Sequence, residues 1–226
     1  MKADGAFDLS ADAAEGKIWL HLVPTKKAVI HGIDGVSRKA AGNNHASHYY
    51  SITRLTTTGS LQVHAQDFEV RGESWFDHEW ATNQLASDQA GWNWVSAQFD
   101  DGCELMLYGM RLTNGEIDPA SSGTFVQRDG TALPVASTEF QMMPKLFWTS
   151  AATQARYPIG WEVIVPTLNL RFELQPVLSD QELALTPLTY WEGAVDLRGT
   201  RGNKRIEGRG YLELTGYASP LQELNR

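Results

Sequence analysis

Residues 91–108 read Gly91-Trp92-Asn93-Trp94-Val95-Ser96-Ala97-Gln98-Phe99-Asp100-Asp101-Gly102-Cys103-Glu104-Leu105-Met106-Leu107-Tyr108, and this stretch decides the fold class. Side chains in its first half alternate with the period of two that is typical of β-strands. The Asp-Gly step suits a tight turn, because glycine adopts a positive φ without strain. The stretch therefore predicts a β-hairpin whose second strand runs from Glu104 to Arg111.

The same alternation recurs along the rest of the chain, and helical periodicity is nearly absent. Short polar turn signals separate the candidate strands, which favours a barrel or sandwich of antiparallel hairpins. The expected turns are Thr58-Gly59, Asp100-Asp101-Gly102, Asn114-Gly115, Asp129-Gly130 and Gly202-Asn203. The further expected strands are Ile18–Val23, Ala28–Gly32, Tyr49–Leu55, Leu61–Val70, Gly123–Arg128, Trp161–Val165, Leu170–Gln175, Tyr190–Leu197 and Arg205–Leu214. The one expected helix is a short turn around Pro220–Leu224.

Two of these strands are apolar on both faces, at Trp92-Asn93-Trp94 and at Leu105–Tyr108. Such strands fit a barrel with one face in a ligand cavity and the other against a neighbouring layer. The alternative, that both faces are packed core, stays open. The polar stretch Ala81–Gly91 has no strand pattern and is the best candidate for a domain junction.

Composition argues for a globular protein and against two classes of partner. Hydrophobic residues make up 42% and charged residues 20% of the 226 residues, which argues against disorder. The net charge is -8, and the densest basic cluster, 198–209, is interrupted by Gly, Thr, Asn and Glu. Because phosphate binding needs a concentrated cationic face, we expect neither nucleic acid nor an anionic membrane surface as a partner.

Cys103 is the single cysteine in the sequence, so the chain has no internal disulfide and no thiolate metal site. No apolar run approaches the ~20 residues of a transmembrane helix. The first five residues lack the apolar core of a signal peptide. The compartment is left open: cytoplasmic, or periplasmic or secreted for a parent protein with a leader.

All six histidines lie in the first 78 residues, which raises the question of a metal site. A metal would pair His45 and His48 with His78 and with Glu79 or Asp77. The His45-x-x-His48 spacing is a weak signal, because on a strand these side chains point to opposite faces. Histidines satisfied by hydrogen bonds are the simpler interpretation, and we expect no metal and no other cofactor.

The segment Ser74-Trp75-Phe76-Asp77-His78-Glu79-Trp80 favours proton transfer instead. Asp77 stands among aromatic residues, and desolvation by aromatic carbon would raise the pKa of its carboxyl, as a general acid requires. Aromatic faces would also stabilise a developing cation. The alternative is that Asp77 caps a turn after the strand while Trp75 and Trp80 are core residues.

A second mixed segment is Tyr190-Trp191-Glu192-Gly193. Alternation places Tyr190 and Glu192 on one face. Buried carboxylates need partners, and we expect Glu192 and Glu213 to pair with Arg205 or Arg209. We therefore expect this segment to have mainly a structural role.

Several of these segments together resemble the lipocalin-like AttH family, which includes bacterial carotenoid 1,2-hydratases and predicted secreted hydrolases. The similarity runs from about residue 7 to 218. The runs that carry it are Ser47–Arg54, Gly72–Trp80, Gly91–Trp94, Gly102–Tyr108, Tyr190–Gly193 and Gly210–Tyr217.

The resemblance implies two consecutive lipocalin-like β domains with a pocket at or near their junction. These would be a partial N-terminal domain, 1–84, and a C-terminal β-barrel, 85–226. The chain lacks an early segment of Glu-Trp-Trp character that is usual in the family, so we expect the first domain to be truncated.

In carotenoid hydratases an aspartate protonates a terminal double bond, assisted by a histidine and aromatic residues. By motif position the aspartate matches Asp77 and the histidine matches His48, with Trp75 and Tyr50 as the aromatic residues. The hydratases carry tyrosine where this chain has Trp75 and tryptophan where it has Tyr50, so the two aromatic residues are exchanged. The resemblance thus implies a catalytic group of four residues, with the ligand held by Trp80, Trp92, Trp94, Tyr108 and Tyr190.

We therefore hypothesise that the protein binds an apolar small molecule, an isoprenoid or polyene, and hydrates it by acid catalysis. Two rivals stay open: a binding protein that leaves its ligand unchanged, and a cofactor-free cyclase of the Diels–Alder type. The sequence does not identify the substrate or the oligomeric state.

Overall fold

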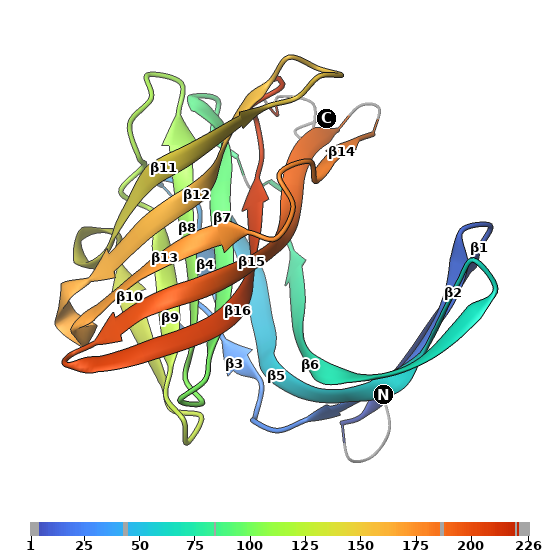
Figure 1. Cartoon of the computed structure of the whole chain (residues 1–226). Helices are drawn as coiled ribbons and strands as arrows, with labels where there is room; N and C mark the ends of the chain where they lie inside the picture. Colours follow the sequence, from blue (N-terminus) through green and yellow to red (C-terminus); the bar gives the residue numbers. More distant parts are fainter. Residues whose placement is uncertain (1–4, 43–44, 84, 186–187, 220, 222–226) are drawn as a thin grey trace. The chain divides into compact units, whose positions relative to one another are not determined.

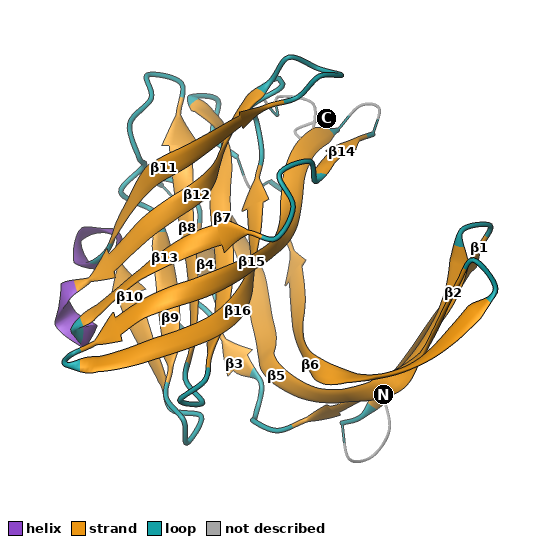
Figure 2. Cartoon of the chain, in the orientation of Figure 1, coloured by secondary structure: helices purple, strands orange, loops and turns teal. Residues whose placement is uncertain are grey.

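The all-β prediction is confirmed by a computed structural model, which describes residues 5–42, 45–83, 85–185, 188–219 and 221. Its described helices are two 3-10 turns, η1 (Ser137–Glu139) and η2 (Pro166–Leu168), drawn in purple in Figure 2. The helical turn expected around Pro220–Leu224 lies outside the described residues except for Leu221. In the part of the chain that the structure describes, no helix is long and apolar enough to cross a membrane.

The strands form two sheets in which every named pair is antiparallel (Figure 1). The first sheet has six strands and is built on the long strand β5, which pairs with β2, β3, β4 and β6. Its strands are β1 (Phe7–Ala13), β2 (Gly16–Pro24), β3 (Val29–Ile30), β4 (Ser37–Arg38), β5 (Ala46–Val63) and β6 (Gln66–Trp80).

The second sheet has ten strands in the order β10-β9-β8-β7-β16-β15-β13-β12-β11, with β14 beside β15. Figure 1 shows that this sheet curls. Among the described residues neither end strand, β10 or β11, pairs with a second neighbour, so a closed lipocalin-like barrel stays a prediction. The strands are β7 (Gln89–Phe99), β8 (Glu104–Leu112), β9 (Ser122–Val126), β10 (Ala132–Ala136), β11 (Gln141–Thr149), β12 (Arg156–Val165), β13 (Leu170–Pro176), β14 (Glu182–Ala184), β15 (Thr189–Arg201) and β16 (Lys204–Leu214).

The hairpin that opened the sequence analysis is confirmed as β7 and β8, with Gly102 at φ +81° between them. Two other expectations were wrong. Thr58-Gly59 is not a turn but lies inside β5, where a Cβ on Gly59 would sit 2.0 Å from the carbonyl oxygen of Trp19 on β2. The expected strand Leu61–Val70 is interrupted by the true turn at His64-Ala65, where both residues have positive φ. At Gly59, by contrast, the absence of a side chain lets β5 approach β2 closely.

The chain forms two compact units, one of residues 1–30 and 50–78 and the other of residues 31–49 and 79–226. The first has a small core around Leu22, Ile52 and Leu55. The second has a large core formed by alternate residues of its strands, such as Val95 on β7 and Leu107 on β8. Both β5 and β6 contribute residues to each unit, and the division into domains 1–84 and 85–226 stays a prediction.

Candidate functional site

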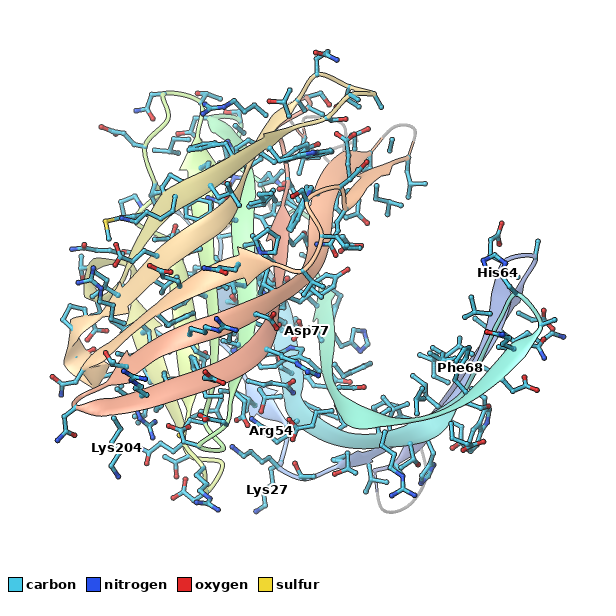
Figure 3. The ribbon with its side chains drawn as sticks, viewed as in Figure 1. Lys27, Arg54, His64, Phe68, Asp77 and Lys204 are labelled. Atoms are coloured by element: carbon cyan, nitrogen blue, oxygen red, sulfur yellow. The ribbon has the colours of Figure 1, made fainter. Side chains whose placement is uncertain are left out.

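Asp77 lies on β6 in the first unit, and one of its carboxylate oxygens accepts two hydrogen bonds. The indole Nε1–H of Trp75 donates to Oδ1 at 2.8 Å, and the hydroxyl of Ser51 donates to the same oxygen. Ser51 is fully buried on β5, so its hydroxyl is a fixed donor. Asp77, labelled in Figure 3, is therefore oriented by its own strand and by the neighbouring strand.

The β5–β6 hairpin explains this arrangement. Side chains two residues apart on a strand share a face, which places Trp75 beside Asp77. The turn at His64-Ala65 folds β6 back along β5, so residues about equally far from the turn, such as Ser51 and Asp77, meet. Sequence reasoning found Trp75 and Asp77 but missed Ser51.

The expected burial of Asp77 among aromatic rings is not observed, because its side chain is exposed. Phe76 and His78, its neighbours in sequence, point to the opposite face of the strand. The alternative interpretation, a turn cap, is also wrong, since Asp77 lies within β6. The carboxyl is therefore a hydrogen-bonded group open to solvent.

Tyr50 does not join Asp77 and Trp75. Its hydroxyl lies 3.3 Å from His78 Nδ1, and its ring packs 5.4 Å from the His78 ring and 6.0 Å from the Phe76 ring. Phe76 in turn packs 5.4 Å from Phe7 on β1. Tyr50 thus lies with the small core of the first unit, on the face opposite Asp77.

His48 and Trp80 belong to the second unit and line one groove of about 400 Å³. Their ring centroids are 5.5 Å apart. His48 Nδ1 lies 3.0 Å from the carbonyl oxygen of Gly35. One predicted catalytic residue and one predicted ligand-binding residue thus meet within this unit.

The other four predicted ligand-binding residues share one face of the ten-stranded sheet. Trp94 on β7 lies opposite Tyr108 on β8 and opposite Glu213 on β16. Glu213 lies opposite Glu192 on β15. Trp92 and Tyr190 lie on the same face, because side chains two residues apart on a strand share a face. The residues brought together in this way are Trp92, Trp94, Tyr108 and Tyr190.

Tyr108 differs from the other three because it is 3% exposed and fully hydrogen-bonded. Its hydroxyl accepts from Ser122 at 2.8 Å and donates to the Arg38 carbonyl at 3.0 Å. The ammonium of buried Lys39 lies 4.0 Å from the Tyr108 ring centroid and 2.7 Å from Glu79 Oε1. This network packs the segment 31–49 against the sheet, and the sequence analysis missed Lys39 because no pattern marked it.

Glu192 and Glu213 differ from expectation in their partners. Trp92 Nε1–H donates to Glu213 Oε1 at 2.7 Å, whereas Arg209 lies opposite Asp196 and Arg205 lies opposite Thr200.

Burial raises the pKa of Glu192, and a hydrogen bond from Tyr190 acts in the opposite direction. Burial and the charges of both glutamates raise the pKa of Tyr211 to about 12. This aromatic and acidic face is therefore partly desolvated.

Among the described residues, no three His, Cys, Asp or Glu side chains are grouped so that they would hold a metal ion.

Comparison with known proteins then gives the family. The sequence matches the AttH-like family over residues 1–217. The chain belongs to the AttH-like family. A crystal structure of an AttH-family protein from Nitrosomonas europaea matches this AttH-like fold with a TM-score of 0.87 and 32% identity, covering 96% of this chain and 66% of that one.

This AttH-like protein is also a distant relative of kievitone hydratase. The enzyme from Fusarium solani subsp. phaseoli is 26% identical over 162 residues, which are 71% of this chain and 45% of that protein. The crystal structure of kievitone hydratase from Nectria haematococca matches with a TM-score of 0.76 and 18% identity over 97% of this chain, a likeness that shows the fold alone. The chain spans less than half the length of the Fusarium enzyme.

Proposed function

We propose that this AttH-like protein is a hydratase that adds water across a carbon–carbon double bond of an apolar isoprenoid or polyene. The observation that carries the proposal is the pair of donors, Ser51 and Trp75, on Oδ1 of solvent-accessible Asp77. The distant relationship to kievitone hydratase supports the same class of reaction.

Acid-catalysed hydration needs a proton donor whose conjugate base is stabilised as the proton leaves. In the proposed mechanism the acidic proton of Asp77 is on Oδ2, because Oδ1 accepts both hydrogen bonds. When Oδ2 protonates one alkene carbon, a C–H bond forms, the π bond breaks and the other carbon becomes a cation. The hydrogen bonds to Asp77 strengthen as its negative charge grows, so they favour the transition state over the ground state.

Water completes the reaction. Its oxygen forms the new C–O bond with the cationic carbon, and its released proton returns to Asp77, which restores the acid. The Trp75 ring, beside Asp77 on the same face, supplies a quadrupole that stabilises the cation by about 0.5–1 kcal/mol, the range for solvent-accessible sites. Exposure of Asp77 gives water access to the carboxyl.

The test is turnover of kievitone and of an acyclic carotenoid in isotopically labelled water, with the product followed by mass spectrometry. We expect Asp77→Asn to lower turnover about 100-fold or more, because an amide is no acid at neutral pH. Ser51→Ala removes one donor to a developing charge and should cost about 10-fold. Trp75→Phe keeps an aromatic ring but loses the N–H donor, so it separates the hydrogen bond to Asp77 from the effect of the ring on the cation.

Asp67→Asn is the matched control, because Asp67 is an exposed aspartate on the same strand that accepts a hydrogen bond from Gln62. It should leave turnover unchanged. Full turnover by Asp77→Asn would contradict the mechanism, and a cyclised product that lacks the isotope would favour the cyclase instead.

A second candidate is a binding protein, and the shared aromatic face of the ten-stranded sheet favours it. Half-buried Trp92, Trp94 and Tyr190 offer an apolar surface for a ligand. Recovery of an unaltered polyene after long incubation, with binding lost on Trp94→Ala but not on Asp77→Asn, would choose this function over hydration.

A further inference from the structure

The groove beside His48 is lined by uncharged side chains from three pieces of chain in the second unit. Ala46, Ser47 and His48 come from the start of β5, and Val36 comes from the turn before β4. Trp80 is the last residue of β6, and Ala81 and Thr82 follow it. None of these lining residues is Asp, Glu, Lys or Arg. At about 400 Å³ the groove lies near the lower end of the range for small-molecule sites. A small neutral molecule therefore fits its size and its lack of charge.

The tautomer of His48 follows from its backbone partner. A carbonyl oxygen only accepts hydrogen bonds, so Nδ1 must carry the hydrogen that bonds the Gly35 oxygen at 3.0 Å. Backbone hydrogen bonds in both directions between Ile33 and Val36, at 3.1 and 3.0 Å, close the turn that presents this carbonyl. In this tautomer of a neutral imidazole, Nε2 has the lone pair and acts as a hydrogen-bond acceptor.

Trp80 and Val36 supply the apolar part of the groove. Trp80 is 49% exposed and Val36 is 40% exposed, so both present carbon surface to solvent. The planes of the Trp80 and His48 rings differ by 32° at a centroid distance of 5.5 Å, so the two rings pack against each other. A flat ring that stacks on the exposed part of Trp80 removes apolar area from water.

The hydroxyl groups in the groove do not compete with His48 as acceptors of equal strength. Ser47 is 3% exposed and its hydroxyl is turned to the carboxylate of Glu79, so its oxygen is hardly accessible to a ligand. Thr82 is exposed, and its hydroxyl rotates about the Cβ–O bond, so it is not a fixed acceptor. The bond from Nδ1–H to the Gly35 carbonyl orients the His48 ring, so Nε2 is the preorganised acceptor.

We infer that the His48–Trp80 groove is a binding site for a neutral phenolic ring, which stacks on Trp80 and donates its hydroxyl proton in a hydrogen bond to His48 Nε2. This site lies within the second unit and does not depend on the proposed hydration. A phenol combines the two required features, a flat apolar ring and one strong O–H donor at its edge.

The test compares 4-methylphenol with 4-methylanisole, which has the same ring but no O–H donor. Titration of the full chain is followed by NMR, through the His48 ring nitrogens and the Trp80 indole N–H. We expect the phenol to bind about 5- to 10-fold more tightly than the anisole, the size of one net hydrogen bond. The Nε2 shift of His48 should move with the phenol and not with the anisole.

Two variants separate the contribution of ring stacking to the affinity from that of the hydrogen bond. His48→Asn keeps a donor for the Gly35 carbonyl but loses Nε2, so the phenol and the anisole should bind equally. Trp80→Leu should weaken both ligands about 10-fold, whereas Trp19→Leu should affect neither. Trp19 is a matched control because it is also 49% exposed but lies on β2 in the first unit.

Both altered side chains are exposed, so we expect the variants to fold, and thermal unfolding checks this. Equal binding of the phenol and the anisole by the unaltered protein would overturn the inference. So would the absence of any shift at millimolar phenol, or binding that Trp80→Leu leaves unchanged.

Discussion

At the scale of single residues, His31 is an ionisable group that the fold keeps neutral. Its side chain is 2% exposed, its Nδ1 lies 2.8 Å from Thr124 Oγ1, and its ring lies 4.3 Å from the Tyr49 ring. Burial, together with the charge of Lys39, lowers the pKa of His31 from 6.5 to about 3. Protonation of this histidine is therefore coupled to unfolding.

The pKa of His31 predicts a loss of stability in acid. Between about pH 6.5 and pH 3 the unfolded chain binds a proton at this position and the folded chain does not. The free energy of unfolding should therefore fall as the pH decreases through this window, by up to about 1.4 kcal/mol per pH unit from this group. Denaturant unfolding at several pH values measures the slope.

The His31→Asn variant should have a shallower slope over the same window, because its amide does not titrate. His64→Asn is the control, since His64 is exposed in the β5–β6 turn and asparagine tolerates its positive φ. Identical slopes for His31→Asn and the unaltered protein would contradict the prediction.

Asp77 and Ser51 show how far residue roles could be predicted from the sequence. Trp75 and Asp77 were brought together in the sequence by motif position, and the structure adds that alternation within β6 puts them on one face. The contact with Ser51 depends on the register between β5 and β6, and the turn expected at Thr58-Gly59 gave the wrong register. Counting outward from the turn at His64-Ala65 would have brought the stretch around Ser51 beside the stretch around Asp77.

At the scale of elements, turns with glycine at a required positive φ were the most predictable features. Gly102, Gly115, Gly130 and Gly202 all have positive φ and all follow from the expected turn signals. Gly59 was mistaken for a turn because a sequence does not distinguish a glycine that bends the chain from one that lets two strands approach. Strands with few alternating apolar residues, such as β1, were missed for a related reason: their exposed side chains leave no pattern.

Gly102→Ala tests the turn of the β7–β8 hairpin. At φ +81° an alanine meets the Cβ strain of the left-handed region, and the loss of stability should be about 1 kcal/mol. The atom nearest to the new Cβ would be Arg128 Cγ at 3.2 Å, on a flexible side chain that can move away. The cost should therefore come from the backbone, and thermal unfolding measures it.

Gly72→Ala is the control, because Gly72 lies in β6 with ordinary φ and a Cβ there would have no neighbour within 4 Å. Its stability should stay the same or rise slightly, since alanine loses less backbone entropy on folding. An equal loss for both variants would assign the effect to glycine content rather than to the turn.

At the scale of the whole molecule, the two units differ greatly in the amount of core that each one contains. The core of the first unit is Leu22, Ile52 and Leu55, with Phe7, Leu20 and Phe76 packed against it. That of the second unit draws on most of its ten strands. The sequence indicated all-β structure throughout but not this inequality, because strands of similar apolar content bury very different fractions of it.

The inequality predicts that the first unit opens before the second. Amide hydrogens of β1 and β2 should exchange faster than those of β7, β8 and β16, because local opening there exposes little apolar area. Leu55→Ala, at a fully buried position of the small core, should lower protection mainly in the first unit. Leu107→Ala, equally buried in the large core, should destabilise the second unit by about 2–5 kcal/mol. Hydrogen exchange resolved by peptide measures both effects, and equal protection of all strands, lost together in one transition, would show instead that the two units open as one.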